Sequence, residues 1–171
     1  MQYLKKIENV NRTDWILKGL MIAAAAGAVQ MGLVMLAGTP KSMLMVALAV
    51  LAVLTLAAVL VGVLAASSQN KTMQKRIAAL EPTASVPFEQ AQFANVSDEV
   101  LLGNDWLVVR KGTKYSFWTR EIVSRIEVRQ QKESSDKGIL EVYIKGSPNP
   151  EQMPVTSAQI VPTQLQNWLG V

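Results

Sequence analysis

The sequence predicts a transmembrane hairpin of two helices, followed by a small, mainly antiparallel β domain that a C-terminal α-helix caps. Three observations predict this fold class. Two long apolar runs lie close together near the N-terminus, short segments of alternating polarity follow, and helical spacing returns near the end. We therefore divide the chain into a basic arm (1–18), the hairpin (19–66), a juxtamembrane helix with a linker (67–87) and the β domain (88–171).

The first apolar run, residues 19–37, holds one polar side chain, Gln30, and no charge. The second run, residues 43–66, holds only Thr55 as a polar residue. As helices they would reach roughly 28 Å and 36 Å, which matches the hydrocarbon thickness of a bilayer. The alternative is a pair of buried helices in a soluble fold. A domain of this size cannot cover two helices that are apolar on every face.

The connection between the runs, residues 38–41, is short enough to require a tight turn, so the helices should be antiparallel neighbours. Gly38 can end the first helix and Pro40 can start the second. Small residues recur every four positions and would let the two backbones approach closely. They are Ala24, Ala28 and Gly32 on the first helix and Ala58, Gly62 and Ala66 on the second. These faces could equally hold a protein partner or a second copy, or merely reflect abundant alanine.

The arm before the hairpin is polar and basic, with a weak apolar face that would suit the membrane surface. Trp15 is expected at the membrane interface, where Lys18 can reach the headgroups. A cleaved signal peptide is the alternative, but the long arm and the immediate second span favour a retained helix. Seven basic residues flank one side of the spans and one flanks the other. The positive-inside rule then predicts a multi-pass inner-membrane protein with both termini cytoplasmic.

After the hairpin, residues 67–80 continue with helical spacing, either as an extension of the second helix or as a separate helix. Lys71, Lys75 and Arg76 lie there and could touch anionic lipid, or form an ordinary solvated face. Pro82 to Pro87 reads as a linker.

From residue 88 the period changes to two, which predicts an antiparallel sheet that is half buried. The predicted strands are 100–102, 106–110, 115–119, 125–129, 140–144 and 153–155. Pro162 can open a final helix on which Leu165, Trp168 and Leu169 share one face. Such a helix would plug the open end of a small barrel.

Composition excludes several kinds of chemistry. The chain has 171 residues, half of them hydrophobic, with no Cys and no His. Disulfides, thiol catalysis and imidazole-based relays are therefore absent, and we expect no cofactor, no metal and no enzymatic activity. The net charge of +4 does not indicate nucleic-acid binding, because residues 67–171 carry 12 basic and 11 acidic side chains.

The run DEVLLGNDWLVVRKGTKYSFWTREIVSRIEV (98–128), the later strand pair and the final helix around LQNWL resemble bacterial membrane-anchored PH-like domain proteins. In that family a PH-like domain often follows two transmembrane helices. The resemblance implies a bent antiparallel barrel capped by a C-terminal helix, and it implies no catalytic residues.

The strongest candidate site is the basic turn formed by Arg110, Lys111 and Lys114, which could contact lipid phosphates or be an ordinary solvated hairpin. Trp118 and Tyr143 could anchor a partner if exposed, or else pack beneath the sheet. We therefore expect a membrane-anchored interaction or scaffold protein. The alternatives are recognition of anionic lipid by the basic turn and juxtamembrane helix, or an accessory role in a transporter with Gln30 facing partner helices.

Overall fold

The computed structural model describes residues 2–36, 41–130, 137–156 and 162–170. The chain forms two compact units, Lys5–Lys71 and Met1–Leu4 together with Thr72–Val171. We call the first the hairpin unit and the second the β unit, and describe each by itself. The elements run in the order α1 (Gln2–Leu36), α2 (Lys41–Leu80), η1 (Glu81–Thr83), η2 (Phe88–Gln90), β1 (Ala94–Asn95), β2 (Val100–Leu102), β3 (Trp106–Lys111), β4 (Lys114–Thr119), β5 (Val123–Gln130), β6 (Lys137–Ile144), β7 (Glu151–Thr156) and α3 (Pro162–Leu169).

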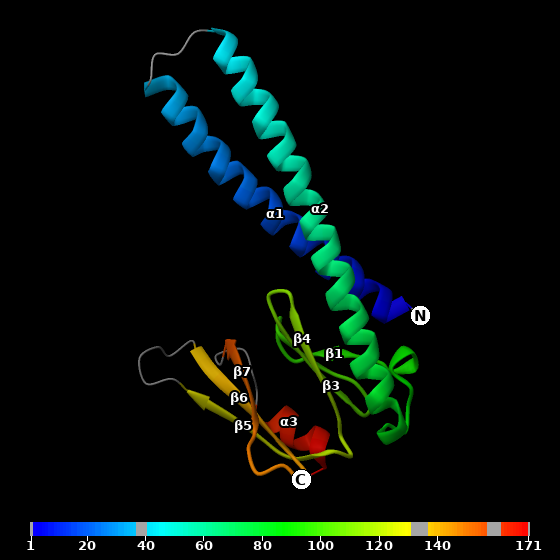
Figure 1. Cartoon of the computed structure of the whole chain (residues 1–171). Helices are drawn as coiled ribbons and strands as arrows, with labels where there is room; N and C mark the ends of the chain where they lie inside the picture. The colour runs from blue at the N-terminus through cyan, green and yellow to red at the C-terminus, as the bar shows by residue number, and fades with distance from the viewer. Residues whose placement is uncertain (1, 37–40, 131–136, 157–161, 171) are drawn as a thin grey trace. The chain divides into compact units, whose positions relative to one another are not determined.

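The hairpin unit is formed by two long continuous helices, α1 and α2 (Figure 1). Residues 2–18, which the sequence sets apart as a basic arm, are the first turns of α1. No Gly or Pro interrupts them, so nothing ends the helix before the apolar run begins. Likewise, residues 67–80 are an extension of α2 and not a separate helix. Most of the predicted tight turn, residues 38–40, lies outside the described residues.

Two glycines permit the close crossing of α1 and α2. A Cβ added at Gly19 would lie 2.6 Å from the carbonyl oxygen of Ala58, and one at Gly62 would lie 2.9 Å from that of Trp15. Both distances are shorter than real Cβ contacts, and the obstructing atoms belong to the backbone. The predicted stripe on the second helix is therefore confirmed at Ala58 and Gly62.

The predicted stripe on the first helix is wrong. Ala24, Ala28 and Gly32 are exposed, and a Cβ at Gly32 would meet no atom within 4 Å. The face of α1 that α2 covers carries instead Gly19, Ala23 and Gly27, which are also spaced by four residues.

Polar side chains explain this choice of face. Asn11 and Trp15 continue the same four-residue series as Gly19. The Asn11 amide donates to Asn70 Oδ1 at 2.6 Å, and the Trp15 indole N–H donates to Gln69 Oε1 at 2.6 Å. Asn11 is fully buried in this arrangement, and turning α1 toward its other stripe would break both hydrogen bonds. Counting small residues could not detect this constraint.

The β unit contains two antiparallel sheets, in the orders β1-β2-β3-β4 and β5-β6-β7. The main core lies between these sheets and α3. It includes Leu107 and Trp118 from the first sheet, Leu140 and Val142 from the second, and Leu165 from α3. The two sheets and the final helix confirm the architecture expected from the sequence.

The expectation of a half-buried sheet is wrong for β3. Trp106, Leu107, Val108 and Val109 are all completely buried, so both faces of this strand are covered. On the face away from the main core, Phe88 packs edge-on against Trp106 and Phe117 at centroid distances of 5.0 and 5.6 Å. The unbroken apolar run of β3 is typical of a strand buried on both sides.

The segment before η2 is docked on the first sheet, so describing Pro82 to Pro87 as a linker is wrong. Thr83 shares a hydrogen bond of 2.5 Å with the hydroxyl of Thr119. The backbone N–H of Ser85 donates to Asp105 Oδ2 at 3.0 Å, and the indole N–H of Trp106 donates to the carbonyl of Val86 at 2.8 Å. The polar partners of this segment lie far from it in the sequence. The sequence of the segment itself, with its two prolines, therefore gives no sign of the docking.

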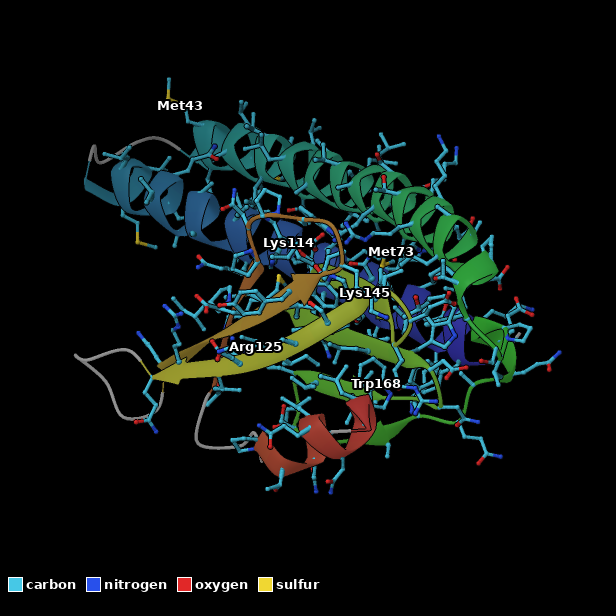
Figure 2. The ribbon with its side chains drawn as sticks, turned by 90° about the horizontal axis from the view of Figure 1, so that it is seen from below. Met43, Met73, Lys114, Arg125, Lys145 and Trp168 are labelled. Carbon is cyan, nitrogen blue, oxygen red and sulfur yellow. The ribbon has the colours of Figure 1, made fainter. Side chains whose placement is uncertain are left out.

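The final helix α3 closes the core as predicted. Leu165 and Trp168 are buried, Leu169 packs against the core, and the Trp168 indole N–H donates to the carbonyl of Gly103 at 2.8 Å. Figure 2 shows Trp168 on α3 beside the strands.

Candidate functional site

The basic turn is the tip of the β3–β4 hairpin, where Lys111 pairs with Lys114 in the strand register. Gly112 adopts a positive φ of 57°, which a tight reversal of this kind requires. The Arg110 guanidinium lies 5.9 Å from the centre of the Tyr115 ring and donates to the carbonyl of Gly112. The turn therefore gathers the three predicted cations at one end of the β unit.

One of these cations is already compensated. The Lys111 ammonium lies 2.9 Å from Glu99 Oε1, and Glu99 Oε2 also accepts the backbone N–H of Thr156 at 2.7 Å. Burial alone would raise the pKa of Glu99, but the hydrogen bonds from Lys111 and Thr156 together hold it below its usual value. Glu99 thus remains a carboxylate beside the turn and reduces its positive charge.

The structure excludes Trp118 as an exposed anchor. Its side chain is fully buried in the main core, and its indole N–H donates to Glu151 Oε2 at 3.0 Å. Because strands of this sheet carry apolar residues on both faces, alternation alone could not show which face is solvated. Packing beneath the sheet, the alternative for this residue, is what the structure shows.

The three cations that the sequence places after the second apolar run, Lys71, Lys75 and Arg76, do not act as one group. Arg76 forms two hydrogen bonds with the Glu151 carboxylate, at 3.1 and 3.0 Å. Lys75 is exposed in the β unit, whereas Lys71 is exposed in the hairpin unit. Arg76 therefore links α2 to β7 through an exposed ion pair, and the two lysines are exposed surface cations.

Tyr143 belongs to a charged network on the outer face of the second sheet, which we call the charged face. Its hydroxyl donates to Glu141 at 3.1 Å and to Glu127 at 3.4 Å. The Arg129 guanidinium lies 2.9 Å from Glu141, and Arg125 pairs with Glu127. Tyr143 is therefore held by carboxylates and is only partly available to a partner.

The electrostatics of the charged face are internally balanced. The hydrogen bond from Arg125 lowers the pKa of Glu127. Burial, reinforced by the hydrogen bond to Glu141, raises the pKa of Tyr143. Sequence reasoning named only Tyr143 here, although alternation does place Arg125, Glu127 and Arg129 together on one strand face.

The described part of the chain contains no group of three or more acidic, His or Cys residues that could hold a metal ion. The carboxylates of Glu127 and Glu141 lie opposite each other in the strand register but are paired with arginines. Such an arrangement can hold two strands together or meet a charged surface. It offers no unengaged acid and base for proton transfer.

No protein-family model matches the chain, and no curated protein matches it. Among solved structures, the chain is similar to a DUF1696 family protein with a pleckstrin-homology domain from Shewanella loihica. The match has a TM-score of 0.33 and 17% identity, and it covers 57% of this chain and 92% of the other. The strand order and the final helix of the chain itself define its fold.

Proposed function

We propose that this chain is a membrane-anchored, non-enzymatic interaction or scaffold protein with a cytoplasmic PH-like domain. The observation that carries the proposal is where the apolar surface lies. All 19 large hydrophobic side chains that are exposed in the described chain lie between Leu17 and Leu64, in the hairpin unit. A water-soluble protein rarely exposes so large a continuous apolar surface, whereas a bilayer would cover it.

The low burial of the two helices favours a membrane hairpin over a pair of buried helices in a soluble fold. The most apolar 18-residue stretches of the candidate spans Tyr3–Met35 and Met43–Thr83 have mean hydropathies of 1.6 and 3.0. Only 11% and 6% of these stretches are buried inside the protein. A core helix of a soluble protein would be mostly covered by its own chain.

The bonds between the helices support a retained first helix over a cleaved signal peptide. Removing α1 would take away the partners of Gln69 and Asn70 and would open the close contacts at Ala58 and Gly62. A signal peptide is removed from the mature protein, so a closely packed interface between the two is not expected.

An interaction role is supported by the state of the polar groups. Lys111 of the basic turn is paired with Glu99, and the arginines of the charged face are paired with Glu127 and Glu141, so a partner would meet charged side chains that are already held in place. The accessory role in a transporter has weaker support, because the Gln30 amide donates to the carbonyl of Ala47 within the hairpin.

Cell fractionation and a topology reporter test the membrane part of the proposal. The full chain should stay in the membrane pellet after alkaline carbonate extraction. A reporter that is active only outside the cytoplasm should be silent when fused after Val171 and active when inserted at residues 38–40. Release into the supernatant, or strong activity at Val171, would contradict the proposed anchoring or orientation.

Crosslinking in native membranes followed by purification would then identify the partner, and repeated recovery of the chain alone would argue against a scaffold.

Recognition of anionic lipid by the basic turn is the second candidate. The β3–β4 turn favours it, because it brings three cations together at one tip of the β unit. Replacing Arg110, Lys111 and Lys114 together by Gln should abolish salt-sensitive binding to anionic vesicles if the turn reads lipid. We expect the parent β unit to bind such vesicles weakly, because Glu99 compensates Lys111. Micromolar binding that the triple change removes would favour lipid recognition over the scaffold.

A further inference from the structure

The crossing of α1 and α2 leaves an apolar groove along one side of the hairpin, with a volume of about 360 Å³. Its lining includes four alanines and two larger side chains. The alanines are Ala23, Ala26, Ala57 and Ala58, and the larger side chains are Leu54 and Val61. This volume falls within the range of ligand-binding clefts, near its lower end.

One end of the groove carries a positive charge. Trp15 and Lys18 complete the lining at this end. The Lys18 ammonium lies 5.4 Å from the centre of the Trp15 ring, and the hydrogen bond from Trp15 to Gln69 holds that ring in place. A tryptophan and a lysine together at the end of an apolar helix are typical of the membrane interface.

The length of the groove matches one leaflet of a bilayer. From Trp15 to Ala26 the helix rises by roughly 17 Å, and half of the hydrocarbon core is about 15 Å thick. The groove thus runs from the expected headgroup level, at Lys18, to about the middle of the membrane.

We propose that this groove binds one anionic phospholipid, with an acyl chain along the small residues and the phosphate beside Lys18. The proposal rests on the proposed membrane location. An ammonium group has three N–H donors, so Lys18 can bind a phosphate in addition to its contacts within the protein, and basic pockets between transmembrane helices bind anionic headgroups. The positive end of the groove is what favours an anionic lipid over a neutral one.

A second copy of the chain fits the groove less well. A helix about 10 Å across would occupy more than roughly 1,000 Å³ over this length, so only its side chains could enter. A larger groove of about 490 Å³ runs beside Ala24 and Ala28, but its lining contains no charged residue. It therefore has no feature that selects a headgroup.

Native mass spectrometry of the full chain in a neutral detergent tests the proposal. The probes are phosphatidylglycerol and phosphatidylcholine with the same acyl chains, added separately at equal concentrations. We expect one phosphatidylglycerol bound per chain. Lys18→Gln should reduce the preference for phosphatidylglycerol about fivefold. Ala57→Phe, which fills the groove, should reduce the retention of both lipids.

Two matched variants serve as controls. Lys6→Gln removes an exposed charge of the same helix, and Ala52→Phe adds an exposed ring to α2 away from the groove. Both should bind lipid as the parent does. Equal retention of the two lipids by the parent, or equal losses in Lys18→Gln and Lys6→Gln, would overturn the proposal. So would a dimer that Ala57→Phe dissociates, since a second copy would then occupy the groove.

Carbonate extraction of the same membranes separates this proposal from the proposed function. A chain that stays in the pellet but retains no lipid through Lys18 would overturn the lipid site alone. A chain released from the pellet would overturn both.

Discussion

The β unit should fold without the hairpin, and its stability should depend on where the chain is cut. A fragment that begins at the predicted domain boundary, residue 88, lacks the docked segment before η2. A fragment that begins at Thr72 keeps this segment. We therefore compare fragments 72–171 and 88–171, and expect the longer one to be clearly more stable.

The magnitude follows from what the shorter fragment loses. Three hydrogen bonds join Thr83, Ser85 and Val86 to the first sheet, and each contributes about 1 kcal/mol. The sum of roughly 3 kcal/mol is a large part of the whole stability of a small domain, about 5–15 kcal/mol.

Urea unfolding followed by circular dichroism measures the difference, and amide dispersion in NMR spectra shows whether each fragment is folded. Fragment 72–171 should give a dispersed spectrum and a cooperative transition. Fragment 88–171 should be less stable by about 3 kcal/mol and should unfold at a lower urea concentration. A Thr83→Ala change in the longer fragment should cost about 1 kcal/mol, as the control for a single contact. If the two fragments have unfolding free energies within about 1 kcal/mol, the docked segment does not stabilise the β unit and the reasoning fails.

Three further predictions follow from single contacts. In fragment 72–171, Trp168→Ala should cost about 3–5 kcal/mol in urea unfolding, whereas Gln166→Ala on the exposed side of α3 should change little; a loss below about 1 kcal/mol would show that α3 is not docked. Because the pKa of Glu99 is lowered in the folded state, its contribution to stability is present above the usual carboxylate value of 4.5 and disappears as the pH falls through the lower folded value. Glu99→Gln should therefore flatten the acid limb of the stability curve over that window, and an unchanged limb would contradict the pairing with Lys111. In the hairpin, Gly62→Ala should push the helices apart, whereas Gly32→Ala should not; nitroxide labels on the two helices would report the separation, and equal distances in both variants would refute the close crossing.

The candidate site was only partly predictable from the sequence. The basic turn follows directly from Lys111-Gly112-Thr113-Lys114 between two apolar segments, and the structure does bring its three cations together. Its compensation by Glu99 was not predictable, because Glu99 and Thr156 approach the turn from other strands. The sequence does not determine the burial of Trp118 for a related reason, since alternation assigns residues to the two faces of a strand but does not show what covers each face.

The sequence by itself determined the order of the two long helices, the strands β2 to β7 and α3, but it did not predict β1 or the short helices η1 and η2. The two long apolar runs require helices wherever they are placed, and period-two segments with turn residues between them require strands, because both patterns are local consequences of backbone geometry. The amphipathic pattern from Pro162 likewise predicts both α3 and the burial of Trp168.

Only the tertiary structure decided which surfaces meet. α2 covers the series Asn11, Trp15, Gly19, Ala23 and Gly27 and leaves the equally regular series of Ala24 and Ala28 exposed. The small residues of either series would allow close packing. The choice between them depends on hydrogen-bond partners more than fifty residues away, which local periodicity does not contain.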